Sequence, residues 1–155
     1  MYNVLLFDDR PQIRISFMER CEEYNINIIP CRDIYEADEE WAEKKDDIHA
    51  IVLDIMMSPK GLKESLRDKT KGGLLTGWFW LWKQINPQNL PRHPAQDKCL
   101  IIYSAYEQDY KQYIQQADDD EKKFSIDHTK FIDKNDVDAD KVLEYLKNNI
   151  TIEKN

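Results

Sequence analysis

The sequence is poor in cysteine, glycine and proline, and it has no long hydrophobic run. It contains 3 Cys, 4 Gly and 6 Pro in 155 residues. The cysteines are odd in number and form no Cys-x-x-Cys pair, which speaks against both a disulfide framework and a zinc site and favours reduced, buried thiols. No apolar stretch is long enough to span a bilayer, and no signal peptide pattern precedes the first apolar run. We therefore expect a cytoplasmic protein without membrane contact.

Positive charge is in the minority. The chain has 22 Lys and Arg against 30 Asp and Glu, which gives a formal net charge of -8. Nucleic-acid phosphates would be repelled by this excess, so nucleic acid is not an expected partner. The length and the 41% hydrophobic content are typical of one folded domain, and we expect a single domain over residues 1–155.

Five short apolar runs alternate with segments of helical spacing, which is the pattern of βα units around a parallel sheet. Their hydrophobicity is continuous, as in strands that are covered on both faces. The predicted strands are Asn3–Phe7, Asn27–Ile29 extending toward Cys31, Ala50–Leu53, Leu100–Tyr103 and Lys130–Ile132.

The intervening segments predict five helices. Pro11 is favoured in a first helical turn, and Asp33 can cap the second helix. Ile13, Phe17 and Cys21 lie on one face of the first helix. The other predicted helices cover about 74–85, begin near Glu107, and include Val142, Leu143, Leu146 and Ile150.

Two connections are longer than a compact βα fold needs, at about 58–76 and about 117–129. The first begins near Pro59 and ends among Gly72, Gly73 and Gly77. Between residues 58 and 71 it is locally basic, and two interpretations are open: a solvated, mobile loop or a segment that docks a partner. The basic residues are Lys60, Lys63, Arg67, Lys69 and Lys71, against Glu64 and Asp68.

Aromatic residues are concentrated in the run Trp78–Trp82, which is apolar on every side of a helix. Trp80 is expected to lie away from the core face, so burial under the long loop and an exposed partner-binding patch are equally good interpretations. The histidines, His49, His93 and His128, have no metal-binding spacing. We expect them at the surface or at its boundary.

Polar residues follow four of the predicted strands. Asp8 and Asp9 end the first, Asp54 the third and Ser104 the fourth, and Lys134 follows the fifth. The strand order 2-1-3-4-5 would bring the three carboxylates together at the topological switch point. Clustered carboxylates repel one another unless a cation is held among them, and Mg²⁺ prefers such oxygen ligands. A carboxylate can also act as a nucleophile toward phosphorus.

Four motifs carry a resemblance to a known family: FDD at 7–9, VLDIMM at 52–57, IYSAY at 102–106 and FIDK at 131–134. In order and placement they resemble the receiver domain of two-component response regulators. The resemblance implies a flavodoxin-like, doubly wound, five-stranded parallel sheet in three α/β/α layers. It also implies that Asp54 is the phospho-acceptor, that Ser104 and Lys134 contact the phosphoryl group, and that Ser104 and Phe131 change position together as a switch. The implied Mg²⁺ ligands are Asp8, Asp9, Asp54 and the backbone carbonyl of Met56.

The function implied by this resemblance is that of a stand-alone receiver, a signalling domain rather than an enzyme. A histidine kinase or phosphotransfer protein would phosphorylate Asp54 in the presence of Mg²⁺. No output domain is expected after the last helix, so the signal would pass by protein contacts to a downstream protein that the sequence does not identify. The expected face is that of the fourth helix, the fifth strand and the fifth helix. A homodimer is left open.

Two alternatives remain. A degenerate receiver would bind partners without phosphorylation, and it is suggested by the rebuilt loop after Asp54 and by Asn135, which stands where the family usually has proline. An aspartate-nucleophile phosphohydrolase also uses carboxylates, a hydroxyl and a lysine at strand ends. Its nucleophile and acid are normally two residues apart, whereas Asp8 and Asp9 are adjacent.

Overall fold

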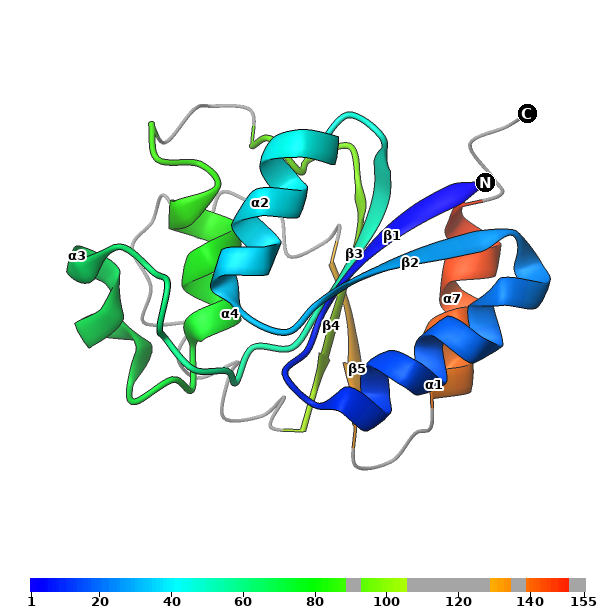
Figure 1. The fold of residues 1–155 in the computed structure, drawn as a ribbon, viewed down its shortest axis with the longest axis horizontal. Helices are drawn as coiled ribbons and strands as arrows, with labels where there is room; N and C mark the ends of the chain where they lie inside the picture. The colour runs from blue at the N-terminus through cyan, green and yellow to red at the C-terminus, as the bar shows by residue number, and fades with distance from the viewer. Residues whose placement is uncertain (89–92, 106–128, 135–138, 151–155) are drawn as a thin grey trace.

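The structure, a computed structural model, describes residues 1–88, 93–105, 129–134 and 139–150. In these ranges the chain forms a five-stranded parallel sheet with the order β2-β1-β3-β4-β5 (Figure 1). The predicted fold class and strand order are confirmed. The strands are β1 Tyr2–Phe7, β2 Ile26–Cys31, β3 Ile48–Leu53, β4 Cys99–Ser104 and β5 Thr129–Asp133.

Helices cover both faces of the sheet (Figure 1). One face carries α1 (Pro11–Cys21) and α7 (Ala139–Ile150), and the other carries α2 (Ile34–Lys44) and α4 (Thr76–Phe79). A 3-10 turn, η1 (Glu22–Tyr24), follows α1. None of the described helices is long and apolar enough to cross a membrane.

The strand side chains alternate between two cores, as expected for a sheet that is covered on both faces. In β1, Leu5 and Phe7 point toward the α2 and α4 side, while Val4 and Leu6 point toward the α1 and α7 side. All four are at most 1% exposed. Each core is therefore closed by its own pair of helices.

The predicted helix signals are confirmed where the structure describes them. Pro11 opens α1, and the Asp33 carboxylate accepts a hydrogen bond from the Glu36 N–H at 2.9 Å, as an N-cap does. Phe17 and Cys21 are buried, and burial raises the pKa of the Cys21 thiol to about 11. The buried residues of α7 include the four predicted from the sequence: Val142, Leu143, Leu146 and Ile150.

The tryptophan-rich helix corrects one prediction. It consists of α4 followed by a π-helical turn, η3 (Trp80–Gln84). Trp80 is fully buried: its ring centroid lies 5.3 Å from that of Phe7 and 6.3 Å from that of Trp41, and its Nε1 donates to Asp38 at 2.8 Å. The expectation that Trp80 lies away from the core is wrong, because the helix is covered by α2 as well as by the sheet. Since Trp78 and Trp82 are also buried, the tryptophans form no exposed patch.

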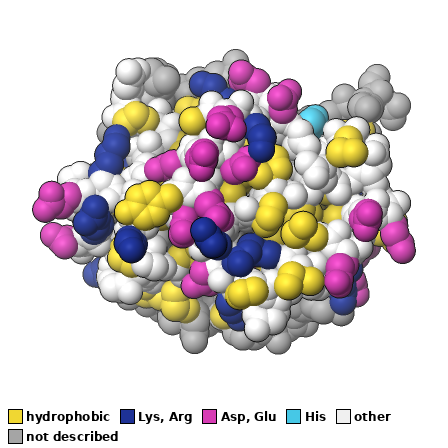
Figure 2. Space-filling model, viewed as in Figure 1, with side chains coloured by type: hydrophobic (Ala, Val, Ile, Leu, Met, Phe, Trp, Pro, Cys, Tyr) yellow, Lys and Arg dark blue, Asp and Glu magenta, His cyan; other side chains and the backbone are white. Residues whose placement is uncertain are grey.

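The 58–76 segment contains regular structure of its own. It contains a short helix, α3 (Glu64–Arg67), and a 3-10 turn, η2 (Asp68–Thr70), and it buries Leu62, Leu66 and Thr70. The five basic side chains are exposed, as predicted. Figure 2 shows Lys and Arg mixed with Asp and Glu at the end of the molecule where α3 lies, and acidic side chains gathered over α2.

His93 corrects another prediction, since it is buried rather than at the surface or its boundary. Its Nδ1 accepts the Ala95 N–H at 3.0 Å, its Nε2 lies 2.6 Å from the Leu81 carbonyl oxygen, and its ring packs against Trp82. Burial lowers the pKa of His93. His49 is exposed, as expected. The predicted helix near residue 107, His128, Asn135 and most of the 117–129 connection lie outside the described residues.

Candidate functional site

The parallel ladder continues one residue past the ends of β1 and β3. The Asp8 N–H donates to the Cys31 carbonyl at 3.1 Å, and the Asp54 N–H donates to the Phe7 carbonyl at 2.8 Å. These bonds fix the backbones of Asp8 and Asp54 beside each other at the carboxyl end of the sheet. This is the edge where doubly wound folds bind ligands.

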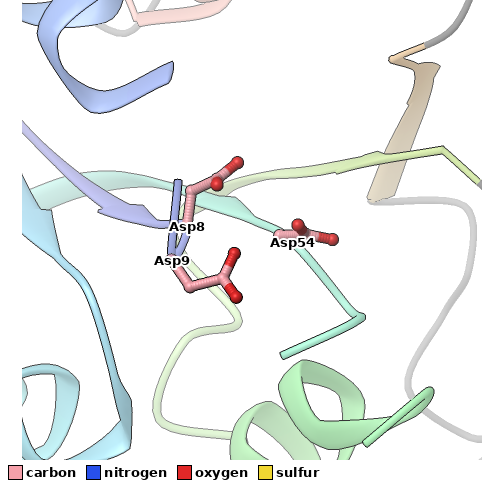
Figure 3. A group of neighbouring side chains, drawn as sticks. All are labelled: Asp8, Asp9 and Asp54. Atoms are coloured by element: carbon pink, nitrogen blue, oxygen red, sulfur yellow. The ribbon is translucent and has the colours of Figure 1, made fainter. Parts of the chain in front are cut away.

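The three predicted carboxylates meet at this edge. Oxygen atoms from Asp8, Asp9 and Asp54 all lie within 4.8 Å of one another. Figure 3 shows the Asp8 and Asp9 side chains leaving the end of β1 and the Asp54 side chain leaving the end of β3. Asp8 and Asp54 are buried, whereas Asp9 is exposed. The cluster is therefore accessible from solvent on the Asp9 side.

Lys134 reaches this cluster from the end of β5. Its Nζ lies 2.5 Å from Asp8 Oδ2 and 2.7 Å from Asp54 Oδ2, and its side chain is only 4% exposed. The Lys134 N–H donates to the Ser104 carbonyl at 3.1 Å, so the β4–β5 ladder also holds the residue in place. The ammonium is thus directed at the two buried carboxylates.

The charges in this group do not balance. The carboxylates of Asp8, Asp9 and Asp54 outnumber the Lys134 ammonium by two negative charges. Burial raises the pKa of Asp54 and the neighbouring Asp8 raises it further, while Lys134 acts in the opposite direction. The three carboxylates and their excess of negative charge fit a divalent cation such as Mg²⁺, which takes carboxylate, carbonyl and water oxygens as ligands.

Two arginines outside the predicted site residues also hold Asp8. The Arg10 N–H donates to Asp8 Oδ1 at 2.9 Å, and its guanidinium Nε lies 3.7 Å from the same oxygen. Arg14 donates to the Asp8 backbone carbonyl at 2.7 Å. Arginine at the start of the first helix was the only sequence signal for these contacts. These contacts fix the orientation of Asp8 at the end of β1.

The loop that follows β3, residues 54–57, is held by the end of the 58–76 segment and the start of α4. A Cβ on Gly77 would lie 2.2 Å from the Asp54 carbonyl oxygen, so only glycine fits there without displacement. The Gly77 N–H donates to the Ile55 carbonyl at 2.9 Å. The glycines at 73 and 77 were visible in the sequence, but no residue pattern linked them to Asp54.

The remaining predicted residues lie near the same end of the sheet. Ser104 is the last residue of β4, is buried, and pairs in register with Asp133. Phe131 pairs with Ile102, is half-buried and packs against the core on the α2 side. The Met56 N–H donates to Asp54 Oδ1 at 3.1 Å, and the Met56 side chain is exposed.

Comparisons with known proteins agree with this geometry. No family model matches the sequence, and a search of curated proteins finds no match. Solved structures match over nearly the whole chain. A response regulator receiver domain protein from Clostridium thermocellum superposes with a TM-score of 0.59 at 17% identity, covering 99% of this chain and 98% of that one. The chain has the receiver-domain fold.

Two further structures show the same likeness. A response regulator from Desulfuromonas acetoxidans has a TM-score of 0.60 at 15% identity and covers 98% of both chains. The bacteriophytochrome response regulator AtBRR has a TM-score of 0.55 at 13% identity, with 95% of this chain and 91% of that one covered. At these identities the likeness establishes the fold.

Proposed function

We propose that this chain is a stand-alone receiver that accepts a phosphoryl group on Asp54 in a Mg²⁺-dependent reaction and signals through protein contacts. One observation carries the proposal. In a receiver fold, the carboxylates of Asp8, Asp9 and Asp54 lie within 4.8 Å of one another, and Lys134 reaches two of them. The residue types, their strand-end positions and the charge balance all suit phosphoryl chemistry.

The chemistry would begin with an Asp54 carboxylate oxygen forming a bond to phosphorus. The bond from phosphorus to the leaving group breaks, and its electron pair goes with a histidine nitrogen of a protein donor or with the carboxylate of acetyl phosphate. When bound, Mg²⁺ would neutralise charge on the phosphoryl oxygens, with Asp8, Asp9, Asp54 and the Met56 carbonyl as its ligands.

Lys134 and Ser104 would then hold the product. The Lys134 ammonium already lies between Asp8 and Asp54, so a small shift would let it pair with a phosphoryl oxygen. The Ser104 hydroxyl would donate a hydrogen bond to the same group. A shift of Ser104 would then move its neighbours in β4 and β5. We propose that Phe131 responds to this shift. Phosphorylation would thereby bias a two-state equilibrium at the β5 and α7 face.

The proposed partners are a histidine kinase or phosphotransfer protein, which donates the phosphoryl group, and a downstream protein, which binds the chain and passes on the signal. The acidic surface over α2 and the formal charge of -8 support a protein partner rather than nucleic acid. Assembly of two copies would also give a phosphorylation-dependent contact. Cytoplasmic localisation follows from a kinase or phosphotransfer donor of this type.

The test is incubation of the full chain with acetyl phosphate, with and without Mg²⁺, followed by intact mass measurement. We expect a Mg²⁺-dependent gain of one phosphoryl group in the wild type and no gain in Asp54→Asn. Asp47→Asn is the matched control, because Asp47 is an exposed aspartate just before β3, at the opposite end of the sheet. It should gain the group as the wild type does.

Other outcomes select the alternatives. If the folded wild type neither binds Mg²⁺ nor gains mass, the proposal fails and the degenerate receiver is favoured. Steady turnover of an aryl phosphate that requires Asp8 or Asp9 and survives Asp54→Asn would favour the phosphohydrolase.

A further inference from the structure

The end of the 58–76 segment bonds to both backbone polar groups of one residue in the β3 loop. The Met57 N–H donates to the Gly73 carbonyl at 3.1 Å, and the Met57 carbonyl accepts the Thr76 hydroxyl at 2.7 Å. Thr76 is completely buried, and its partner is 19 residues away in the sequence. We call Gly73 and Thr76 together the Met57 clamp.

The Met57 clamp acts on its neighbour through the planarity of the peptide bond. The Met56 carbonyl and the Met57 N–H belong to one planar trans unit, in which they point in opposite directions. The bond from the Met57 N–H to Gly73 therefore directs the Met56 carbonyl away from Gly73. On the other side, the Met56 N–H is held by Asp54 Oδ1 at 3.1 Å. Met56 is therefore held at its own N–H, and its carbonyl is oriented through the Met57 N–H of the same peptide unit.

The clamp is itself held by Thr70. The Thr70 hydroxyl accepts the Gly73 N–H at 3.2 Å and donates to the Arg67 carbonyl, and the Thr70 carbonyl accepts the Leu75 N–H at 2.9 Å. Gly73 has a φ of +99°, and a Cβ there would lie 2.6 Å from the Met57 carbonyl oxygen. The backbone conformation and the close approach both require glycine.

The Thr76 hydroxyl has no role in capping its own helix. Thr76 is the first residue of α4, and the preceding Leu75 occupies the N-cap position with no side-chain capping bond. The hydroxyl instead joins the end of the 58–76 segment to the loop that carries Asp54.

We infer that Thr76 is a positioning residue for the cation site, which it serves by holding Met57 and so directing the Met56 carbonyl as a ligand. The inference rests on the proposed function, since it takes the Met56 carbonyl as a Mg²⁺ ligand. It gives the 58–76 segment a defined role: its end orients part of the coordination shell. Removal of such an outer partner typically costs about 10-fold to 100-fold in metal affinity.

The experiment measures the Mg²⁺ dissociation constant of the full chain by calorimetric titration with the metal alone. Thr76→Val keeps the shape of the side chain and removes its donor, whereas Thr76→Ser keeps the donor. We expect Thr76→Val to weaken Mg²⁺ binding about 10-fold or more, and Thr76→Ser to stay within about 3-fold of the wild type. The urea midpoint of each variant is measured in parallel without metal.

A merely structural role predicts a different pattern. Leu146→Ala is the control for lost stability, because Leu146 is fully buried in the other core. It should lower the urea midpoint and leave the Mg²⁺ dissociation constant of the folded protein unchanged. If Thr76→Val behaves like Leu146→Ala, or if Thr76→Ser is as weak as Thr76→Val, the positioning role is wrong.

Two further results keep the outcomes distinct. If Thr76→Val does not fold, Gly73→Ala replaces it, because the added Cβ would displace the Met57 carbonyl and should weaken Mg²⁺ binding by a similar factor; an unchanged constant overturns the inference. If the wild type binds no Mg²⁺, the proposed function fails and the inference fails with it. If the wild type binds and Thr76→Val is unchanged, only the inference fails.

Discussion

The two helical layers of this protein are built in different ways. The layer of α1 and α7 consists of two regular helices with one buried face each. The layer of α2 and α4 contains the folded 58–76 segment, four buried tryptophans and a π-helical turn. Among the described residues, only the second layer bonds to the loop that carries Asp54, whereas the first layer reaches the site through Arg14 of α1, which bonds to the Asp8 carbonyl. The elaborate layer therefore contributes to the site as well as to the core.

The largest expected effects come from truncating a core side chain in each layer, which should lower stability in both layers but Mg²⁺ affinity in only one. Trp80→Ala should cost about 4 kcal/mol and Leu146→Ala about 3 kcal/mol in the free energy of unfolding, because both side chains are fully buried. Trp80 also packs against Phe7, whose carbonyl accepts the Asp54 N–H. Urea unfolding checks the stabilities, and Mg²⁺ titration of the folded variants should show weakened binding for Trp80→Ala alone. Equal Mg²⁺ affinity in the two variants would remove the distinction between the layers.

A smaller effect is expected where α2, the 58–76 segment and η3 are joined. Gln84 donates to Asp38 at 2.7 Å and to the Gly61 carbonyl at 3.0 Å, and it accepts the Lys63 N–H at 2.9 Å. Gln84→Ala should lower the free energy of unfolding by about 1–3 kcal/mol, because the half-buried Asp38 carboxylate and Gly61 carbonyl lose a partner. Gln12→Ala on α1 is the matched control and should change it by less than about 0.5 kcal/mol, since Gln12 is exposed. Similar urea midpoints for the two variants would contradict this account of the junction.

The smallest effect is on the pH dependence of stability. Burial raises the pKa of Asp54 in the metal-free fold above its unfolded value. The stability that the protonated group contributes is therefore complete below the unfolded pKa and is lost as pH rises through the folded pKa. In metal-free buffer, the urea midpoint of the wild type should fall relative to that of Asp54→Asn over this window. A difference between the two midpoints that stays constant with pH would mean that the fold does not disfavour the charged form of Asp54. Added Mg²⁺ should raise only the wild-type midpoint.

The sequence predicted the regular parts of the molecule well. The structure confirms the predictions that rest on local signals. These signals are the continuous apolar runs of the strands, Pro11, the Asp33 cap and the spacing of apolar residues along the last helix. The meeting of Asp8, Asp54 and Lys134 could be predicted from the strand order, because parallel strands bring their carboxyl ends to one edge of the sheet.

The remaining features depend on contacts between distant segments, which local patterns do not reveal. Trp80 is buried because α2 covers it, and Gly61, which packs against Ile34, brings the 58–76 segment onto the same helix. Thr76 and Gly73 bond to Met57 across 16 to 19 positions of the sequence, through the fold of this segment. The burial of Leu62 and Leu66, which holds the segment in place, was not predicted because the surrounding sequence is highly charged.

The most direct test of the central claim is to locate the phosphorylated residue. After reaction with acetyl phosphate and Mg²⁺, reduction with borohydride converts an aspartyl phosphate to homoserine, and peptide mass spectrometry identifies the position. We predict homoserine at position 54 and at no other aspartate. Homoserine at position 8 or 9, or none in a protein that binds Mg²⁺, would contradict the assignment of Asp54 as the phospho-acceptor.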